Sequence, residues 1–280
     1  MSGVGMKAYD LGFGEDPEKL LMEPSGAPLP TAAPELRRTD PVRAGWCGSH
    51  GPAIDSAMWP RGPITGRPMM HALTLRLPAD YQRRGPEFPA IAFFQGEGQF
   101  ADPDSPVTGD LDSEDPFLRD LGGARAHPQL NLLEDIIGGA FALIWLRANE
   151  FDGGPTPPPA DPRRAGEHDG DDGGCNAWDD VEPTISVWLA EREDPNTGSA
   201  PVEDGDDDYQ DPFDDDCEFR AWADELYGRS HLGGTAFPVQ NTPDDLTPYY
   251  LEIEEMSGLN FGCGNARIDL ESDVFDWSCG

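Results

Sequence analysis

The sequence is poor in positive charge, and above all in lysine. Its 280 residues contain 19 Lys and Arg against 54 Asp and Glu, which gives a net charge of −35 at pH 7. Only two of the basic residues, Lys7 and Lys19, are lysines, and basic residues cluster no further than short pairs such as Arg83-Arg84. Affinity for nucleic acids comes mainly from cations that release counterions from phosphates. The composition therefore argues against DNA, RNA or an anionic membrane surface as a partner.

Long apolar runs are also missing. The longest apolar segment, 140–146, is too short to cross a bilayer. Residues 1–13 lack the basic stretch followed by an apolar stretch that a signal peptide needs. We therefore expect a cytoplasmic protein.

Paired cysteines are missing as well. The five cysteines are odd in number and widely spaced, and no Cys-x-x-Cys occurs. This pattern argues against a disulfide framework and favours incidental thiols. Cys47-x-x-His50 has the spacing of half a metal site, with no second half nearby in the sequence. The cysteines are Cys47, Cys175, Cys217, Cys263 and Cys279.

What the sequence has in excess is aspartate. Of the 54 acidic residues 34 are Asp, and both the stretch 151–218 and the remainder of the chain are net acidic. At a salt concentration of 1 M the Debye length falls to about 3 Å, which screens the repulsion between surface carboxylates. The composition is typical of a halophile's cytoplasm. The alternative is an acidic protein from a GC-rich bacterium.

Hydrophobic patterning predicts a mainly β (α+β) fold with a few short helices. Short apolar or alternating runs indicate strands, and 3.6-residue spacing with capping residues indicates helices. Asp115 followed by Pro116 is a typical helix start. The predicted strands are 70–77, 89–95, 141–146, 183–189, 236–240, 249–254 and 265–270, and the predicted helices are 17–22, 115–121 and 219–227.

The domain organisation follows from the composition along the chain. Residues 1–45 are rich in Pro and Gly and are predicted to form an extended arm. Residues 46–280 are predicted to form one domain, interrupted by acidic loop insertions at about 152–178 and 195–217. These insertions contain too little apolar surface to offset the entropy of ordering them.

The two ends of the predicted domain are alike. In the first, Trp59-Pro60 and a turn lead through Pro68 into the strands 70–77 and 90–95. In the second, a Gly-Gly turn leads through Pro248 into the strands 249–254 and 265–270. This echo indicates a tandem duplication.

The same segments resemble the YwqG-like family, a bacterial domain of unknown function. The resemblance rests on His-Leu-Gly-Gly-Thr-Ala-Phe-Pro-Val-Gln at 231–240, on the strand 248–254, on Gly-Cys-Gly-Asn entering 265–269, and on the segments 59–69 and 91–94. It covers about residues 40–280 and implies an internally duplicated β-sheet or β-roll architecture, but no reaction. The sequence departs from the family at Glu252, where relatives often have Gln.

The sharpest candidate for a metal site is the acidic run 204–216. Aligned as an EF-hand loop, it offers Asp204, Asp206 and Asp208, with Asp211 close behind, as oxygen ligands for Ca²⁺. Tyr209 occupies the position that requires Gly, and Asp215 replaces the bidentate Glu. The alternative is a solvated acidic loop. Beyond Ca²⁺, we expect no cofactor.

No catalytic signature is present. The five histidines fall in no metal-binding or catalytic spacing, and neither a nucleophile elbow nor a phosphate-binding loop occurs. A ligand groove is a weaker hypothesis, because only the fold can bring its members together. The candidate groove residues are Trp59, His71, Gln95, Trp222 and Gln240.

Three functions remain open. The first is a non-enzymatic protein that binds a basic protein, in the manner of an immunity or toxin-neutralising protein, through charge complementarity. The second is a hydrolase-like enzyme with a carboxylate beside His71 or His231. The third is binding of a divalent cation by the acidic loop. The sequence implies no particular oligomeric state.

Overall fold

The structure is a computed structural model of the 280-residue chain. It describes residues 5–15, 41–97, 106–135, 138–160, 183–202, 208–214, 216, 218–243 and 245–279.

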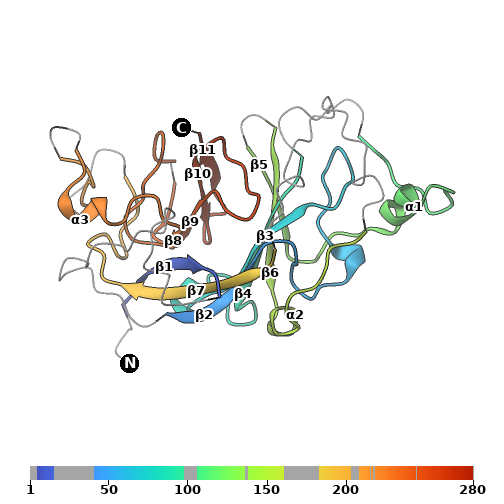
Figure 1. The fold of residues 1–280 in the computed structure, drawn as a ribbon, viewed down its shortest axis with the longest axis horizontal. Helices are drawn as coiled ribbons and strands as arrows, with labels where there is room; N and C mark the ends of the chain where they lie inside the picture. Colours follow the sequence, from blue (N-terminus) through green and yellow to red (C-terminus); the bar gives the residue numbers. More distant parts are fainter. Residues whose placement is uncertain are drawn as a thin grey trace.

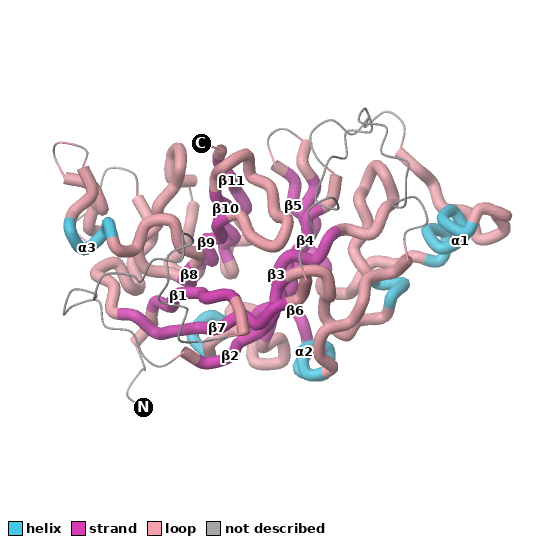
Figure 2. The backbone as a smooth tube through the Cα atoms, viewed as in Figure 1, coloured by secondary structure: helices cyan, strands magenta, loops and turns pink. Residues whose placement is uncertain are grey.

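The molecule is built on one sheet of eleven strands, which curls into a nearly closed barrel (Figures 1 and 2). Every neighbouring pair of strands is antiparallel. The order across the sheet is β11-β10-β9-β8-β1-β7-β2-β3-β4-β6-β5. The strands are β1 (Ala8–Phe13), β2 (Val42–Cys47), β3 (Met70–Arg76), β4 (Ala90–Gln95), β5 (Leu130–Glu134), β6 (Ala140–Leu146), β7 (Ile185–Arg192), β8 (His231–Leu232), β9 (Tyr250–Glu254), β10 (Asn265–Asp269) and β11 (Phe275–Ser278).

The central strands are buried on both faces. Every residue of β4 and β6 is buried. Successive side chains point to opposite faces of a strand, so Ile91 and Phe93 join one hydrophobic cluster while Ala90, Ala92 and Phe94 join another on the far side. This explains why these strands look like continuous apolar runs in the sequence rather than alternating ones.

Aromatic side chains join the two ends of the sheet. Phe275 of β11 lies 4.7 Å from Phe141 of β6 and 6.0 Å from Phe93 of β4, measured between ring centroids. Phe93 and Phe141 stack with an interplanar angle of 5°. Gln95 at the end of β4 exchanges two hydrogen bonds of 3.1 Å with the backbone of Asn260, between β9 and β10. Side-chain packing therefore brings together strands that share no backbone ladder.

The helices are short, as predicted. They are α1 (Pro116–Gly123), α2 (Ala148–Asp152) and α3 (Ala221–Asp224). The expected start of α1 is confirmed, because the Asp115 carboxylate accepts a hydrogen bond of 2.8 Å from the N–H of Phe117 and Pro116 occupies the first turn. Helices α1 and α3 lie at opposite ends of the molecule (Figure 1).

The prediction of an extended arm over residues 1–45 is wrong where the structure describes strands in that segment. Residues 8–13 form β1, which pairs with β7 on one side and β8 on the other, and Val42 already belongs to β2. Asp10 is buried in β1 because Arg192 of β7 donates a hydrogen bond of 2.5 Å to its carboxylate. A partner 182 residues away in the sequence thus lets a polar, glycine-containing segment form an inner strand. The helix predicted over 17–22 lies outside the described residues.

Two other predictions fail near residue 237. Residues 236–240 form no strand, because the N–H of Ala236 donates to the Tyr209 hydroxyl, that of Phe237 donates to the Glu252 carboxylate, and Pro238 has no N–H to donate. The helix predicted over 219–227 is reduced to the four residues of α3, since Phe219 instead makes a β-bridge to Phe213.

The internal echo has a counterpart in the sheet. Strands β2, β3, β4 and β6 follow one another in that order on one side of β7. On the other side β1 comes first, and β8, β9, β10 and β11 follow it in that order. The paired strands β3 and β4 therefore match β9 and β10, as the sequence pattern suggested. Besides β1, the strands β2, β5, β8 and β11 were not predicted. Strand β2 crosses the expected boundary between the arm and the domain at residue 45, and the other three are short or lack a clear apolar alternation.

Among the described residues, no helix is both long and apolar enough to cross a membrane.

The aromatic packing between the sheet ends leads to a test. Replacing Phe93 with Ala should lower the free energy of unfolding by about 3–5 kcal/mol, because it leaves a cavity where β4, β6 and β11 meet. Replacing Leu132 with Ala, on β5 with 53% of its surface exposed, should change the free energy by less than about 0.5 kcal/mol. Denaturant unfolding measures both; equal effects would mean that Phe93 does not support the closure.

Candidate functional site

The predicted groove residues do not line one groove. Trp59 and His71 both lie edge-on to Phe94, at ring-centroid distances of 5.3 and 5.4 Å. All three are buried, and the indole N–H of Trp59 donates to the carbonyl of Met69 at 2.9 Å. Gln95, the next residue along β4, is also buried and is occupied by its hydrogen bonds to Asn260. These three predicted residues come close together, but inside the core.

The other two predicted groove residues lie elsewhere. Trp222 is in α3, where it packs against a small separate cluster of Ala223, Leu226 and Phe237. Gln240 is exposed, and its amide donates to the carbonyl of Cys279 at 3.0 Å. The predicted pairing of Trp59 with Trp222 across a groove is therefore absent, since the two belong to different clusters.

His71 is a structural histidine held in its neutral form. Its Nδ1 lies 2.7 Å from the carbonyl oxygen of Gly48, which can only accept, so Nδ1 carries the proton. Its Nε2 then accepts from the Thr74 hydroxyl, at 2.7 Å. Burial disfavours the charged ring and lowers the pKa of His71 from 6.5 to about 4.

The predicted Ca²⁺ ligands are only partly within the described residues. Asp204 and Asp206 lie outside them, whereas Asp208 and Asp211 lie inside. The Asp211 carboxylate already accepts a hydrogen bond of 2.8 Å from the N–H of Phe213. Among the residues that the structure describes, no group of three or more His, Cys, Asp or Glu side chains is arranged to hold a metal ion. Cys47 is buried as a thiol, and His50 hydrogen-bonds to Thr184 instead of completing a metal half-site.

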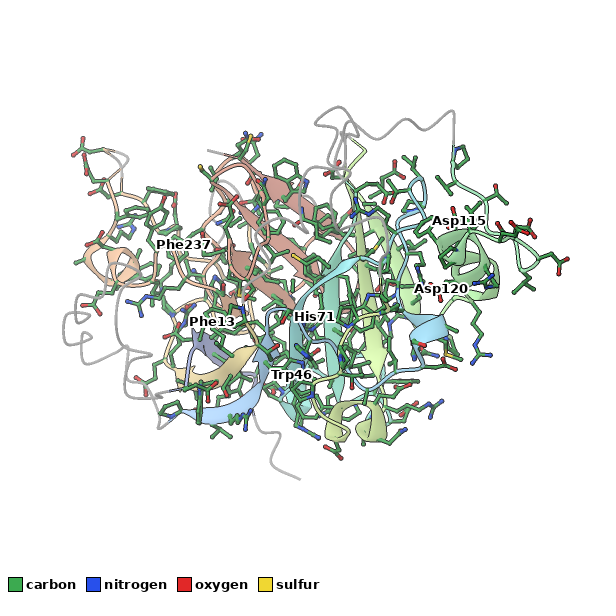
Figure 3. All side chains as sticks on the ribbon, turned by 45° about the vertical axis from the view of Figure 1, so that its right-hand side comes forward. Phe13, Trp46, His71, Asp115, Asp120 and Phe237 are labelled. Carbon is green, nitrogen blue, oxygen red and sulfur yellow. The ribbon has the colours of Figure 1, made fainter. Side chains whose placement is uncertain are left out.

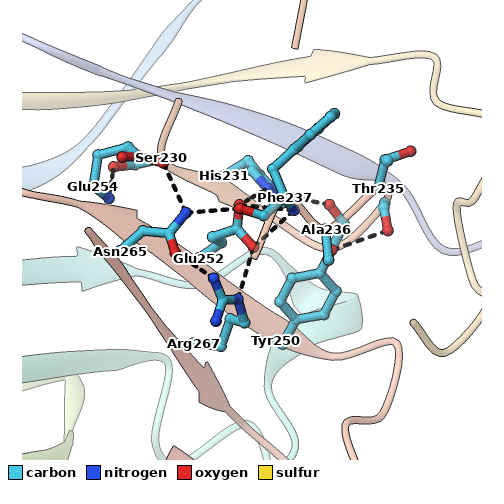
Figure 4. A network of polar contacts seen from close by, with 12 residues as sticks. Ser230, His231, Thr235, Ala236, Phe237, Tyr250, Glu252, Glu254, Asn265 and Arg267 are labelled. Atoms are coloured by element: carbon cyan, nitrogen blue, oxygen red, sulfur yellow. Dashed lines mark hydrogen bonds and ion pairs between the residues drawn. The ribbon is translucent and has the colours of Figure 1, made fainter. Parts of the chain in front are cut away.

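A polar network that the sequence analysis did not predict surrounds Glu252 on β9 (Figure 4). The carboxylate accepts from His231 Nε2 at 3.2 Å and from Arg267 Nε at 3.1 Å. It also accepts from the backbone N–H of Phe237, at 3.1 Å. Asn265 extends the network by donating to the carbonyl of Phe237 at 2.8 Å. The network ties the loop 235–240 to β8, β9 and β10.

The charges in this network compensate one another. Burial alone would raise the pKa of Glu252, but His231, Arg267 and the N–H of Phe237 outweigh it and hold the pKa below its usual range. The His231 ring faces two acceptors, because its Nδ1 lies 2.9 Å from the carbonyl of Gly233.

A second buried ion group adjoins the first. Arg192 donates to Asp10 at 2.5 Å and to Asp194 at 2.9 Å. Asp194 in turn accepts from the hydroxyl of Thr235 at 2.9 Å and from its N–H at 3.1 Å. This group fixes the start of the same loop whose Phe237 is held by Glu252.

The network contains the His–carboxylate pair that an enzyme would need, but it is sealed. His231, Glu252 and Arg267 have no exposed surface, so a substrate has no access to the pair in this conformation. Another His–Glu contact, between His127 and Glu150 at 3.0 Å, fixes the start of α2, where Glu150 also accepts from the N–H of Arg147. The geometry of both pairs is that of structural ion contacts.

One cavity is lined by residues of β1, β2 and β7 and by residues at the end of β3. It has a volume of about 270 Å³. The charged residues at its rim include Arg76, which is paired with Asp152, and Glu191, which is paired with Lys7. None of the predicted groove or metal residues lines it. Its lining residues are Tyr9, Val42, Arg43, Ala44, Arg76, Leu77, Pro78, Leu189 and Glu191.

The exposed feature that stands out is an acidic hairpin next to α3. Phe213 and Phe219 form an antiparallel bridge, and the N–H of Asp214 donates to the carbonyl of Glu218 at 2.9 Å. The Asp214 carboxylate also accepts from the N–H groups of Asp216 and Glu218, at 2.9 and 3.1 Å. These contacts hold three exposed carboxylates at the tip of the hairpin.

Aromatic rings fill the base of this hairpin. Phe219 stacks on Phe213 and lies against Tyr227, both at a centroid distance of 4.8 Å, and it lies 6.0 Å from Phe237. Phe237 is 3% exposed, whereas Phe213 is 37% and Tyr227 is 54% exposed. We call Phe213, Phe219, Tyr227 and Phe237 the aromatic cluster. The sequence placed Phe219 on a helix face, but spacing alone could not show that Phe213 and Tyr227 would meet it.

The lowered pKa of His71 gives stability a defined pH dependence. Because the folded pKa, about 4, lies below the unfolded value of 6.5, the unfolded state binds the extra proton first. This contribution is fully present above pH 6.5 and is lost as the pH falls toward 4. It amounts to about 3 kcal/mol.

The matched variant is His71→Asn, which keeps a donor near Gly48 and does not titrate. Between pH 7 and pH 4 the wild-type protein should lose about 3 kcal/mol more unfolding free energy than this variant. An NMR titration of His71 in the wild-type protein gives a second readout. A ring that protonates near pH 6.5 in the folded protein would contradict the burial argument.

The Glu252 network predicts a large effect of one neutral substitution. Glu252→Gln leaves Arg267 buried with Asp276, at 3.6 Å, as its remaining ion-pair partner among the described residues, and should cost about 2–4 kcal/mol of unfolding free energy. Glu254→Gln is the control, because burial already raises the pKa of Glu254 and its loss should cost less than about 1 kcal/mol. Equal unfolding midpoints for wild type and Glu252→Gln would show that the carboxylate is not needed.

No protein-family model matches the sequence, and neither a curated protein nor a solved structure matches the chain.

Proposed function

We propose that the protein acts by binding a basic protein and that it is not an enzyme. The observation that carries the proposal is the acidic face formed by the hairpin and α3. Between residues 208 and 225 the described residues include seven acidic side chains and one basic side chain, Arg220. The guanidinium of Arg220 is engaged with the carbonyl of Asp211, at 2.8 Å. The face therefore presents negative charge to a partner.

This arrangement suits association better than catalysis. Charge complementarity steers encounter and can raise association rates by orders of magnitude. The carboxylates at the hairpin tip are held by backbone hydrogen bonds and are exposed, so a partner's cations can reach them. The His–carboxylate pair that a hydrolase would use is, by contrast, inside the core.

An immunity-type or toxin-neutralising role is the specific form of this proposal. A basic toxin uses cationic residues to reach anionic substrates, and an acidic protein can cover them. A halophilic cytoplasm fits the same composition, since high salt screens the self-repulsion of a protein with a net charge of −35. In such a cytoplasm, binding has to survive strong screening, which calls for close contacts as well as charge.

The test is affinity capture at two salt concentrations followed by identification of the captured protein. The immobilised protein should retain one basic protein at the higher salt concentration, whereas adventitious polycations should be released. Retention of no basic protein at the salt concentration of the source cells would overturn the proposal.

A matched pair of triple variants shows whether the acidic face is responsible. The test variant is Asp214→Asn, Asp216→Asn and Glu218→Gln, and the control is Asp110→Asn, Asp112→Asn and Glu114→Gln beside α1. Both remove three exposed charges, and in both the first Asn keeps the oxygen that accepts the local backbone hydrogen bonds. The test variant should bind about tenfold more weakly or worse, and the control should bind as wild type does.

A further inference from the structure

We propose that the aromatic cluster is the contact site for a short segment of the partner that carries Arg or Lys next to an apolar residue. The proposal rests on the proposed function and gives it a place and a recognition chemistry. The acidic side chains would attract the segment, and the rings would hold it.

The aromatic cluster is a partly exposed surface whose rings are held in place by the structure beneath them. Phe237 forms its buried floor, because Glu252 and Asn265 fix the backbone of that residue from below. Phe219 lies above the floor, and Phe213 and Tyr227 form the exposed rim. Aromatic rings that are rigidly supported and partly exposed are typical binding hot spots.

The rings of the cluster lack the cation that covers other aromatic rings of this protein. Arg83 lies 3.8 Å from the centroid of Tyr249, and Arg76 lies 4.4 Å from that of Phe151. Arg147 and Arg84 similarly approach Phe88 and Trp145. Within the described part of the chain, no such contact is made with the four rings of the cluster. A cation from a partner therefore has open ring faces to contact.

Exposed carboxylates lie in the same hairpin as two of these rings. Asp214, Asp216 and Glu218 project from the hairpin whose base is Phe213 and Phe219. A cation placed between a ring face and a carboxylate gains from both, since cation–π and ion-pair attraction reinforce each other.

The apolar part of the segment follows from the exposed apolar area. Besides Phe213 and Tyr227, Val239 is partly exposed only two residues beyond Phe237. A side chain such as Leu next to the cation would cover this area. In Figure 3, Phe237 lies toward one end of the molecule, and Asp115 and Asp120 of the α1 region lie at the other.

A second copy of the chain is the poorer occupant. Two copies would bring two acidic hairpins and two net charges of −35 together, and like charges at a contact cost several kcal/mol. Self-association through this surface is accordingly an outcome that would overturn the proposal.

The experiment measures binding of a fluorescent peptide that alternates Arg, Leu and Lys. Two control peptides replace either the Arg and Lys residues with Gln or the Leu residues with Ser. The wild-type protein should bind the first peptide at least about tenfold more tightly than either control peptide, and fluorescence anisotropy reports the affinity.

Protein variants then locate the site. Phe213→Ala and Tyr227→Ala should each weaken binding of the peptide about tenfold. The control Leu111→Ala removes a more exposed apolar side chain beside α1 (63% exposed) and should change binding less than about twofold. Phe213→Leu and Tyr227→Leu keep apolar area but remove the ring, so they should weaken binding about fivefold. Thermal unfolding checks that each variant is folded.

The outcomes separate this inference from the proposed function. If the triple variant of the hairpin loses the captured basic protein while the ring variants bind peptide and partner as wild type does, the cluster is not the contact site and the function stands. If neither set of variants affects capture, the basic protein binds elsewhere, and both the acidic face and the aromatic cluster are excluded as its contact site. Concentration-dependent dimerisation in sedimentation, abolished by Tyr227→Ala, would assign the surface to a second copy of the chain instead.

Discussion

The position of the Glu252 carboxylate governs the second half of the molecule. It is buried on β9 and accepts hydrogen bonds from His231 on β8, from Arg267 on β10 and from the backbone of Phe237. The first two contacts hold three strands in register at one side of the barrel. The third carries the same constraint to the surface, because Phe237 is the floor of the aromatic cluster. A buried ion group usually contributes little to stability. Here its role is to fix the position of the loop 235–240, which has no backbone pairing with a strand.

The buried charged groups of the protein are stabilised by specific partners. Inside, Asp10 and Asp194 pair with Arg192, and Glu252 pairs with Arg267 and contacts His231. Two further buried carboxylates, those of Glu97 and Asp269, accept hydrogen bonds from hydroxyl or backbone N–H groups instead. Some arginines lie instead over the faces of aromatic rings, as Arg83 does over the partly buried Tyr249.

Much of the fold could be predicted from the sequence, and the reason is local. Strands β4 and β6 bury both faces, so their apolar runs are clear in the sequence, and β3 was predicted from its alternation. Helix α1 begins with an Asp-Pro pair that needs no tertiary information. Strand β1 could not be predicted, because Asp10 becomes acceptable in a sheet only when Arg192 is beside it. The strand expected at 236–240 failed for the converse reason, since its N–H groups are taken by Tyr209 and Glu252. The Glu252 network and the aromatic cluster depend on contacts between residues far apart in the sequence. For the same reason the residues predicted to line one groove lie in separate clusters.

The buried histidines in the two halves of the sheet, His71 and His231, have different hydrogen-bond partners. In each half, the glycine that follows the inner strand, Gly48 after β2 and Gly233 after β8, faces the Nδ1 atom of a buried histidine through its carbonyl. In the first half the other ring nitrogen meets Thr74, a neutral partner, and the pKa of His71 falls. In the second half it meets Glu252, and a carboxylate there recruits Arg267 and the backbone of Phe237. The Glu252 carboxylate thus connects the core to Phe237, the floor of the aromatic cluster, whereas the contact of His71 with Thr74 is confined to the core. The contact site that we propose therefore belongs to the second half of the sheet.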